Sequence, residues 1–506
     1  MLNYQTWLET PDVVRIALVQ AQVIVNGSLT TRYLSTHSAT VDGITYLSII
    51  KGDITVDESI STSYAASISY GDIELINIDG SYDSWLNDIW VNKPLKIYVG
   101  PMPTPGNTYT ISDFELVFDG LTDDIDSKSR TQLNLKLRDK LEKLNTSVSE
   151  TLLGNYFQGN IVSESVYTNQ YRNNLKPITF GEVHNITPLL TDPSLLEYMV
   201  NLDSVEQVIE VRDNGIPVAF STSAGTVTLP NGSFRLLRTP VGAVTCSVQG
   251  VKKTVNIAGN YVTNTYTNTA SNTIAVILKL YGQQLDYSEI DSTSFASLGS
   301  QAVGIYLPER INVLNLCQEI AKSCGLILSV TRTGKVKLSE LDIPASASIS
   351  ITEADMLLNT LSVAQKLDVI AGVKLGYAKN WTVQPSLLTS IPQEHKDLYA
   401  TEWLESSQTD SAVKNNYSVT VEPALESSYL IDKAQADVVS LKKLNLFKAQ
   451  RKIMKMTCTA KHLSVQIGNA VTITASRFGL SSGVLGRVVS TKPNWLKGTI
   501  EIGVLI

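Results

Sequence analysis

The sequence predicts a mainly β, multi-domain protein with a minor helical part, of the α+β class. Short runs of β-branched and aliphatic residues recur along the chain and are separated by Asn-Gly and Asp-Gly pairs. These pairs favour tight hairpin turns because both positions tolerate positive φ. Two segments show a clear helical spacing of apolar residues. A length of 506 residues corresponds to about three to four domains.

Residues 1–175 are expected to form a first β domain, an antiparallel sheet or barrel. Leu133, Leu135 and Leu137 alternate with polar neighbours, which is typical of a half-buried strand. Trp85 and Trp90 are expected to pack in its core. The other predicted strands are bounded by turns at Asn26-Gly27, Asp42-Gly43 and Asp79-Gly80; they are Val13–Val25, Leu34–Val41, Ile44–Ile50, Ile68–Ile78, Leu95–Val99 and Phe114–Phe118.

Residues 176–300 are expected to form a smaller β-rich barrel or sandwich. Its hairpins recur about every ten residues, for example Val208–Val211 and Ile216–Phe220 around Asp213-Asn214-Gly215. The Asn- and Thr-rich stretch Thr254–Thr273 is weakly patterned. We expect it to be a long exposed loop or an edge hairpin.

Residues 301–345 are expected to form a small helix-hairpin unit. Val313–Cys324 carries a single apolar stripe, with Asn312 as N-cap and Gly325 just past its end. A hairpin over Leu326–Thr331 and Lys335–Leu341 follows.

Residues 346–506 are expected to form a second β domain with one helix. The helix is predicted over Tyr429–Leu444, with Leu430, Ala434, Val438 and Leu441 on its buried face. The strands predicted near the end of the chain are Ala470–Thr474, Leu485–Ser490 and Thr499–Ile506.

Composition argues against several function classes. Charged residues make up 18%, the net charge is −7 and the pI is near 5.3, which weighs against a protein built mainly to grip nucleic acid. Four cysteines form no CxxC pair and are expected to be buried, inert thiols made in a reducing compartment. No stretch reaches about 18 consecutive apolar residues, and the first ten residues lack the features of a signal peptide. A membrane span is therefore not expected.

No motif predicts catalysis, a cofactor or a metal site. Gly479-Leu-Ser-Ser-Gly483 matches the GxSxG pattern of hydrolases, but no helix and no histidine follow it. We expect a tight surface turn there. His37, His184, His395 and His462 lack metal-ligand spacing and are expected at the surface or in loops. The acidic cluster of Asp119, Asp123, Asp124 and Asp126 does not have the spacing of a calcium loop, so a solvated acidic turn is expected.

Two charge runs stand out and allow three interpretations. Residues Asp113 to Asp126 include six acidic side chains and no basic one, whereas Lys442 to Lys461 include seven basic side chains and no acidic one. The runs are either solvated faces, or complementary surfaces between subunits, or, for the basic run, a strip that touches DNA. Our candidate subunit interface comprises Lys442, Lys443, Lys448, Arg451, Lys452, Lys455, Asp119, Asp123, Asp124 and Asp126.

Four groups of segments, taken in order, resemble bacteriophage tail hub proteins of the tail tip or baseplate. The first runs from Asp72–Gly80 through Trp85–Trp90 and Lys93–Gly100 to Phe118-Asp-Gly120 and Leu135–Asp139. The second is Lys176–Asn185 with Val211–Gly215, and the third is Gly376-Tyr-Ala-Lys-Asn-Trp381. The fourth comprises Ile467–Ile473, Arg477–Leu480 and Gly486–Trp495. Asn469 stands where many such proteins would show Asp, and it keeps the turn chemistry.

The resemblance implies a structural role in the virion. In such hubs, tail-tube-like β domains form a ring that continues the tail tube, adapts its symmetry to a central spike or fibre, and opens for DNA. The resemblance implies a homotrimer, with a homohexamer as the alternative, synthesised in the host cytoplasm. Its expected partners are the tail tube or distal tail protein, the tape-measure protein and the spike or fibre, with DNA passing through unbound.

Two other function classes remain open from the sequence. One is a tail-associated cell-wall hydrolase, for which no catalytic signature is present. The other is a receptor- or carbohydrate-binding tail protein, for which exposed aromatic side chains would be the evidence.

Overall fold

The computed structural model describes residues 7–8, 10, 14–66, 70–104, 107–154, 156–157, 160–161, 172–224, 227–228, 232–282 and 285–506. The chain forms two compact units, each assembled from separate stretches of sequence. Unit 1 comprises residues 1–142, 327–369 and 450–506, and unit 2 comprises residues 143–326 and 370–449. The boundaries of these units differ from those of the four domains expected from the sequence. The four domains stay a prediction.

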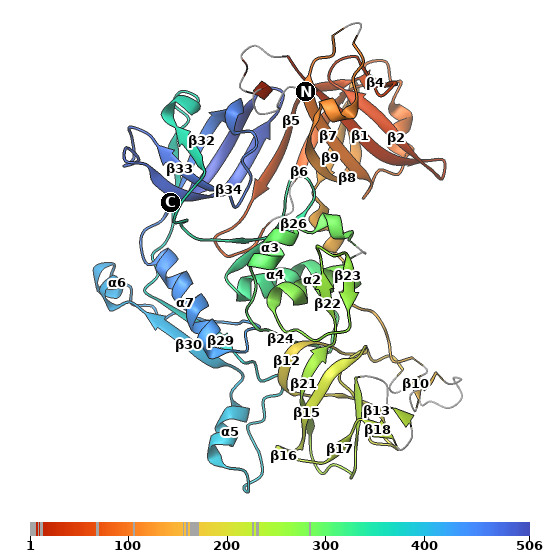
Figure 1. Ribbon diagram of the computed structural model, residues 1–506, viewed down its shortest axis with the longest axis vertical. Helices are drawn as coiled ribbons and strands as arrows, with labels where there is room; N and C mark the ends of the chain where they lie inside the picture. Colours follow the sequence, from red (N-terminus) through yellow and green to blue (C-terminus); the bar gives the residue numbers. More distant parts are fainter. Residues whose placement is uncertain are drawn as a thin grey trace. The chain divides into compact units, whose positions relative to one another are not determined.

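Unit 1 is built on one large sheet that contains strands from both ends of the chain (Figure 1). The main path runs in the order β28-β32-β35-β34-β5-β6-β9-β8-β7-β1-β2-β4-β3, and the short strands β27 and β33 attach beside β34. The strands are β1 (Arg15–Val25), β2 (Ser28–Ser35), β3 (Ala39–Val41), β4 (Ile44–Ser48), β5 (Ile50–Ser59), β6 (Tyr70–Ile76), β7 (Pro94–Pro101), β8 (Glu115–Ser129), β9 (Gln132–Arg138), β27 (Ile349–Thr352), β28 (Ser362–Lys366), β32 (Lys452–Thr459), β33 (Ala470–Thr474), β34 (Val484–Asn494) and β35 (Thr499–Leu505).

Local turn chemistry fixes the first strands of this sheet. Asn26 and Gly27 have φ of 50° and 80°, and Asp42 and Gly43 have φ of 50° and 73°. Two positive φ values in succession match the right-handed twist of a two-residue hairpin. The antiparallel pairing of β1 with β2, from Leu18↔Ser35 to Val25↔Ser28, follows from the first turn.

The core of unit 1 joins residues from both ends of the chain. Trp85 and Trp90, which are 4% and 1% exposed, belong to the same apolar cluster as Met454, Val488 and Ile502. The prediction that both tryptophans pack in the core is confirmed. The last strand, β35, lies between β32 and β34, so the apolar chain end is paired in the sheet as predicted.

One strand differs from its prediction in length. β8 runs from Glu115 to Ser129 and not only to Phe118, so the four aspartates of the acidic cluster lie in a strand and not in a turn. Lys136 and Arg138 of β9 make this possible because they form ion pairs with Asp126 and Asp123. Cross-strand pairs of opposite charge stabilise a sheet that like charges alone would destabilise.

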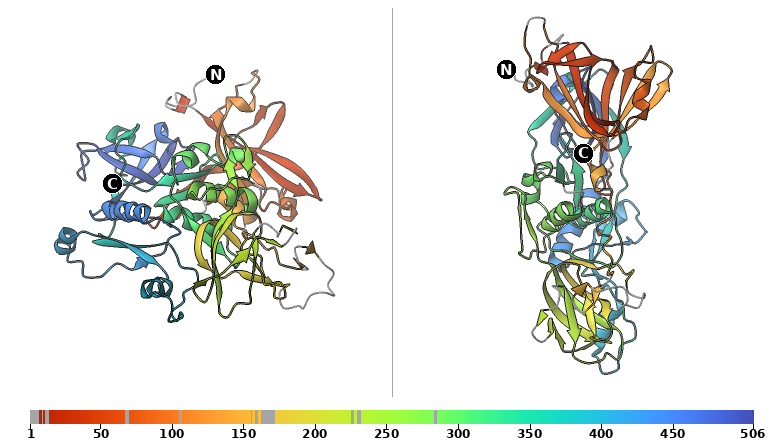
Figure 2. Two further views of the ribbon diagram at one scale, coloured as in Figure 1. Left: turned by 60° about the horizontal axis from the view of Figure 1, so that its bottom comes forward. Right: turned by 90° about the vertical axis from the view of Figure 1, so that its right-hand side faces the viewer.

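Unit 2 contains several small sheets, which can be followed in the yellow, green and light-blue parts of Figure 2. A five-stranded sheet has the order β16-β15-β21-β12-β24, and a four-stranded sheet has the order β13-β14-β20-β17. A three-stranded sheet, β30-β29-β31, carries α7 across β29 and β30. The strands are β12 (Ile178–Ile186), β13 (Leu189–Asp192), β14 (Glu197–Met199), β15 (Val205–Asp213), β16 (Ile216–Pro217), β17 (Phe220–Ser221), β20 (Ser233–Leu236), β21 (Val244–Val251), β24 (Gly304–Leu307), β29 (Gly372–Tyr377), β30 (Leu404–Thr409) and β31 (Leu425–Glu426).

Three two-stranded hairpins complete unit 2, and one further hairpin lies in unit 1 apart from its first residue, Leu326. Their strands are β10 (Tyr156–Phe157) with β11 (Asn160–Ile161), β18 (Ser223–Ala224) with β19 (Val227–Thr228), β22 (Thr254–Asn256) with β23 (Tyr261–Thr263), and β25 (Leu326–Val330) with β26 (Val336–Glu340). The hairpin predicted over Leu326–Leu341 is therefore present.

The described α-helices lie in unit 2. They are α2 (Ala270–Tyr281), α3 (Ser292–Ser297), α4 (Val313–Ser323), α5 (Gln393–Ala400), α6 (Ser411–Asn416) and α7 (Lys433–Phe447). The α4 prediction is confirmed, including the Asn312 side chain that accepts from the Asn315 amide at 3.1 Å. The mainly β fold class with a minor helical part is confirmed as well.

Two predictions need correction, one for the stretch that contains α2 and one for α7. Only the first part of Thr254–Thr273 is a hairpin, because α2 begins at Ala270 after the N-cap Thr269. Residues Ile274–Leu278 of α2 are buried all round, so they lack the polar face that would have distinguished this helix from a strand.

The helix α7 begins at Lys433 and not at Tyr429, and it buries another face than the predicted one: Leu430 is buried but precedes the helix, and Ala434 is exposed. Val438 and Leu441 are about half exposed, at 52% and 46%, whereas Val439 and Leu444 are buried. The helix carries apolar residues on both sides, and its buried side also makes polar contacts. Ser440 shares a hydrogen bond with Ser406, and Lys443 donates to Glu426.

Candidate functional site

The pairing of β5 with β34 joins the N-terminal strands of unit 1 to its C-terminal strands. The register is Ser59↔Ser490, Glu58↔Thr491 and Thr55↔Asn494, and we call this pairing the seam. β5 and β34 lie side by side in Figure 1. The seam makes one continuous sheet from strands that are more than 400 residues apart along the chain, as the Glu58–Thr491 contact with its separation of 433 shows.

A buried arginine holds the seam. Arg332, in the turn between β25 and β26, is 4% exposed, and Glu58 is 3% exposed. Arg332 Nε donates to Glu58 Oε2 at 2.7 Å, and its terminal nitrogens donate to the Leu463 and Val465 carbonyls at 2.9 and 2.7 Å. Thr491 Oγ1 accepts from Arg332 Nη2 at 2.7 Å and donates to Glu58 Oε2 at 2.6 Å. Both buried charges are therefore paired and hydrogen-bonded, the condition under which burial of an ion pair is tolerated.

The hairpin tip that carries Arg332 fits tightly against β8. The Arg332 carbonyl accepts from the Asp119 amide at 2.7 Å. Gly334 has φ of 75°, and a Cβ there would lie 2.8 Å from the Asp119 carbonyl oxygen. The position therefore requires glycine both for its conformation and for its space.

A network of neutral amides joins distant segments in unit 2. Asn185 Nδ2 donates to Asn380 Oδ1 at 2.8 Å and to the Thr382 carbonyl at 2.7 Å. Asn380 Nδ2 donates to the Tyr399 and Thr401 carbonyls at 2.8 and 3.0 Å. We call Asn185 and Asn380 the amide clamp. They belong to two of the segments that resemble hub proteins, Lys176–Asn185 and Gly376–Trp381.

Aromatic side chains surround the amide clamp. Lys379 Nζ lies 4.5 Å from the ring centroid of Trp381 and 5.2 Å from that of Trp403. The Tyr306 and Trp381 rings meet edge to face, with centroids 6.1 Å apart. Burial raises the pKa of Tyr306, whose hydroxyl donates to the Thr187 carbonyl at 2.6 Å. This tyrosine is therefore a hydrogen-bond donor and not an acid at neutral pH.

The acidic half of the candidate subunit interface is largely paired inside unit 1. Asp119 pairs with Lys140 at 3.0 Å, Asp126 pairs with Lys136 at 2.7 Å, and Asp123 pairs with Arg138. Asp124 is exposed, and its Oδ1 accepts from the Ile125 amide.

The basic run from Lys442 to Lys461, which contains the basic half of the candidate interface, is divided between the two units. Lys442, Lys443 and Lys448 belong to unit 2, whereas Arg451, Lys452, Lys455 and Lys461 belong to unit 1. Several have partners in their own unit: Lys443 with Glu426, Lys448 with Asp410, Lys455 with Glu501 and Lys461 with Asp355. Lys443 is only 4% exposed, so its charge serves the fold of unit 2. The role of the remaining residues between subunits stays a prediction.

Lys452 has a different environment from the rest of the run. It stands directly opposite Lys366 where β32 pairs with β28. Among the described residues, neither lysine forms an ion pair. Like charges directly opposite each other destabilise a sheet. The end of β28 therefore brings together two lysines, Lys366 and Lys452, that have no acidic partner among the described residues.

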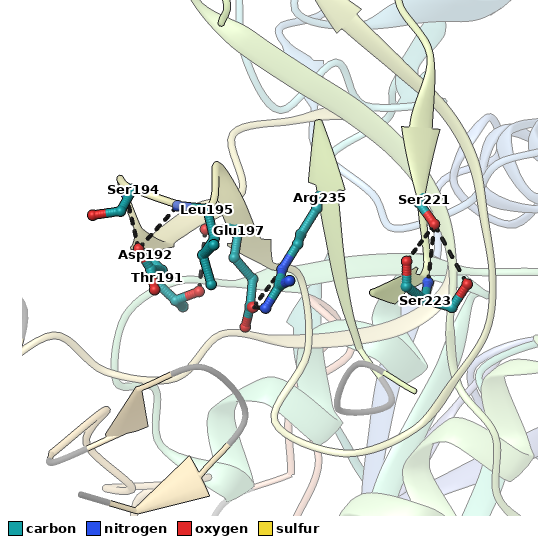
Figure 3. Close-up of polar contacts among 8 residues, drawn as sticks. All are labelled: Thr191, Asp192, Ser194, Leu195, Glu197, Ser221, Ser223 and Arg235. Atoms are coloured by element: carbon teal, nitrogen blue, oxygen red, sulfur yellow. Dashed lines mark hydrogen bonds and ion pairs between the residues drawn. The ribbon is translucent and has the colours of Figure 1, made fainter. Parts of the chain in front are cut away.

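Figure 3 shows a second group of buried charges, in the four-stranded sheet of unit 2. Glu197 is fully buried and accepts from Arg235 Nε and Nη2 at 3.0 and 2.8 Å. Asp192 Oδ1 accepts from the Ser194 and Leu195 amides at 2.8 and 3.1 Å and so shapes the turn from β13 to β14. The described residues contain no group of three or more His, Cys, Asp or Glu side chains that could hold a metal ion.

The remaining candidate residues have structural environments. Ser481 lies in the exposed connection between β33 and β34, so Gly479–Gly483 forms the predicted surface turn. His37, His184 and His395 are exposed, whereas the prediction for His462 is wrong. His462 is 4% exposed, and its Nε2 lies 3.5 Å from Asp355 Oδ2.

The four cysteines are free and buried, as predicted. Burial raises the pKa of Cys324 and of Cys458 to about 12. It also raises the pKa values of Cys246 and Cys317. All four thiols therefore stay protonated at neutral pH.

Asn469 performs the turn role that the sequence suggested. Its Oδ1 accepts from the Gln466 amide at 2.8 Å, and the adjacent Gly468 has φ of 79°. This short-range bond positions the entry to β33. A carboxylate is not needed for it.

Comparisons with known proteins find similarity at the level of structure only. No protein-family model and no curated protein sequence matches the chain. A tail protein from Neisseria meningitidis is similar at 9% identity, with a TM-score of 0.42 and coverage of 97% of this chain and 96% of that chain. The 43 kDa tail protein of prophage MuSo2 from Shewanella oneidensis is similar at 10% identity, with a TM-score of 0.41 and coverage of 97% and 98%.

A third similar structure is an E. coli component of the type VI secretion system, described as structurally similar to T4 bacteriophage tail proteins. Its identity is 8% and its TM-score is 0.32, with coverage of 92% of this chain and 76% of that chain. Similarity to phage tail proteins extends over almost the whole chain. Among the described residues, no helix has both the length and the apolar character that a membrane crossing requires.

Proposed function

We propose that this chain is a structural, non-enzymatic component of a phage tail tip or baseplate. It forms the hub ring that continues the tail tube, adapts the tube to the central spike or fibre, and lets DNA leave. The observation that carries this proposal is the seam, through which two β domains from the two ends of one chain become a single sheet. One subunit therefore presents two β domains to a ring, as the motif resemblance implies.

The ends of this sheet supply the surfaces that a ring needs. The sheet ends at β28 on one side and at β3 and β4 on the other. Four of the five residues of β28 are exposed. An exposed edge strand is a template for pairing with another chain, and closed symmetry removes the risk of open-ended association. We propose a homotrimer, or a homohexamer, closed at these edges.

The charges of the β28 edge suit an acidic neighbour. Lys366 and Lys452 face each other without an acidic partner among the described residues, and a carboxylate on the next subunit would relieve their repulsion. The net charge of −7 also suits a channel that DNA must pass, because basic walls would retain phosphates. The partners we propose are the tail tube or distal tail protein, the tape-measure protein and the spike or fibre.

Electron microscopy of the purified chain tests the ring directly. Two-dimensional averages of negatively stained particles should show threefold or sixfold rings with a central hole, formed alone or after addition of the tail-tube protein. Single compact particles under both conditions would contradict the hub.

Charge reversal tests the proposed interface. The triple change Lys448→Glu, Arg451→Glu, Lys452→Glu should abolish ring formation, and Lys452→Glu alone should account for most of the loss. The new carboxylate would face Lys366, so the single variant should fold at least as stably as the parent chain. Light scattering gives the oligomeric state, and thermal unfolding gives the stability.

Lys335→Glu is the matched control for this test. Lys335 is an exposed residue in the β25–β26 hairpin of unit 1, and its reversal changes the net charge by the same amount. It should leave the rings intact. Rings that survive Lys452→Glu, or that are lost equally with Lys335→Glu, would show that the β28 edge is not the specific contact.

A further inference from the structure

A cavity of about 560 Å³ lies in unit 2 beside the amide clamp. Its walls come from four separate stretches, 173–175 with 177, 187–189, 306 with 308, and 381–382. A volume of this size is typical of sites for small molecules, which occupy about 300–1,000 Å³. The hub role does not require such a cavity.

The lining has a distinctive chemistry. Trp381 and Tyr306 provide an aromatic wall, and prolines and leucines provide further apolar surface. The polar groups are the neutral side chains of Asn173, Asn174, Thr187 and Thr382, and none of the lining residues that the structure describes carries a charge. The cavity is therefore built for a ligand that is uncharged and that has both apolar faces and hydroxyl or amide groups.

The walls are fixed before any ligand binds. The Tyr306 ring and the Lys379 ammonium both contact the indole of Trp381. The hydroxyls of Thr187 and Thr382 are hydrogen-bonded to each other at 2.9 Å, and the Thr382 carbonyl accepts from Asn185. A preorganised site loses little conformational entropy on binding.

An acceptor of the amide clamp lies next to this wall and is unused. Asn185 is 2% exposed, and its Oδ1 is buried and accepts no hydrogen bond from any residue that the structure describes. The Nδ2 of the same amide binds the carbonyl of Thr382, which lines the cavity. The Oδ1 atom is enclosed and does not line the cavity, so Asn185 holds the wall at Thr382 and does not itself contact a ligand.

We propose that this cavity binds a neutral saccharide of one to three sugar units. The C–H face of a sugar ring would stack on Trp381, and its hydroxyls would bond to the amides of Asn173 and Asn174 and to the threonine hydroxyls. Charged sugars are disfavoured because no side chain in the described part of the lining neutralises them. A neutral saccharide of the host cell surface has this chemistry, so the site would give the tail protein contact with its host.

Titration of the full chain with named sugars tests the proposal. The probes are N-acetylglucosamine, its trimer, maltotriose and a rhamnose disaccharide, with glucuronic acid as the charged comparison. Calorimetry and saturation-transfer NMR should detect binding of at least one neutral probe and weaker binding of glucuronic acid. The assay does not depend on ring assembly, so its result is separate from that of the hub proposal.

Two tryptophans provide a matched pair of variants. Trp381→Ala should weaken binding by at least about tenfold through loss of the stacking wall. Trp403→Ala should leave affinity within about threefold, because Trp403 contacts the same lysine but does not line the cavity. Asn174→Ala, a change at a half-buried loop position, should weaken binding without affecting the fold.

Three outcomes would overturn the proposal. One is the absence of binding by all four neutral probes, and another is binding that survives both Trp381→Ala and Asn174→Ala. The third is binding of a proline-rich peptide in the cavity together with no response to the sugars, which would identify a protein ligand.

Discussion

The seam of unit 1 and the amide clamp of unit 2 both join distant segments of the chain, but with different chemistry. Both connect segments that are far apart along the chain: Arg332 and Glu58 are 274 residues apart, and Asn185 and Asn380 are 195 residues apart. The seam uses a buried ion pair, whereas the clamp uses neutral amides. A buried charge is strongly destabilising when it loses its partner, whereas an unpaired amide costs less.

Because of this difference, the two joints should not tolerate substitution equally. The polar groups that surround Arg332 all accept from the same guanidinium, so its loss would affect every one of these contacts at once. The amide clamp spreads its bonds over two side chains and several backbone carbonyls. Substitutions in the two joints should therefore differ in size, and this comparison can be measured.

Removal of the guanidinium should have the largest effect. Arg332→Met leaves the Glu58 carboxylate buried with Thr491 as its one side-chain donor among the described residues, and we expect unit 1 to lose about 3–5 kcal/mol of stability. Two-unit chains do not unfold in one step, so hydrogen exchange resolved by peptide is the appropriate measurement. Amides of β5 and β34 should exchange faster, and those of unit 2 should not change.

The seam also carries exposed ion pairs that serve as the internal control. Lys492 pairs with Asp57 at 3.3 Å, with side-chain exposures of 47% and 62%. Lys492→Met should cost no more than about 1 kcal/mol because solvent screens the pair. Equal effects of Arg332→Met and Lys492→Met would refute the view that burial of charge holds the seam.

The clamp should show an intermediate effect. Asn185 has φ of 54°, so Asn185→Gly keeps the backbone conformation and removes only the amide group. We expect a loss of about 1–3 kcal/mol, because carbonyls and amides of the clamp lose their buried partner. Hydrogen exchange should increase around Thr382 and Asn380 and stay unchanged in unit 1.

A second asparagine of similar conformation isolates the amide contribution. Asn214 has φ of 50°, and its side chain is outside the clamp. Asn214→Gly should change stability by only a few tenths of a kcal/mol, since glycine tolerates this backbone well. A similar loss for both variants would mean that backbone freedom, and not the amide, explains the result.

The sequence predicts the local parts of this structure well, and the reason is physical. The hairpin turn at Asn26-Gly27, the cap of α4 at Asn312 and the turn role of Asn469 depend on neighbours within a few residues. The tryptophan core was predictable too, because large aromatics are usually buried.

The joints were harder to predict because their partners are remote. Nothing near Arg332 indicates Glu58, and the acidic cluster could be placed in a strand only by noticing that Lys136 and Arg138 alternate on β9. Asn185 and Asn380 did lie in two of the recognised segments, so the motifs marked the clamp without showing its geometry. The buried face of α7 was ambiguous because both faces carry apolar residues.

A pH titration should give the smallest effect and compares a buried with an exposed carboxylate of unit 1. Burial alone would raise the pKa of Asp355. Hydrogen bonds from the Thr352 amide and hydroxyl and from Lys461 outweigh burial, and His462 lies nearby. Together these groups hold the pKa of Asp355 well below its usual range. A lowered folded-state pKa gives stability that is complete above the unfolded value, about pH 4, and that is lost as the pH falls through the folded value. Asp355→Asn should therefore flatten the loss of unit 1 stability below about pH 4, measured as urea midpoints across the acid range.

Asp57→Asn, at an exposed seam carboxylate, should leave that profile nearly unchanged. If the two variants gave the same profile, acid sensitivity would come from many surface carboxylates together and not from the hydrogen bonds that hold Asp355.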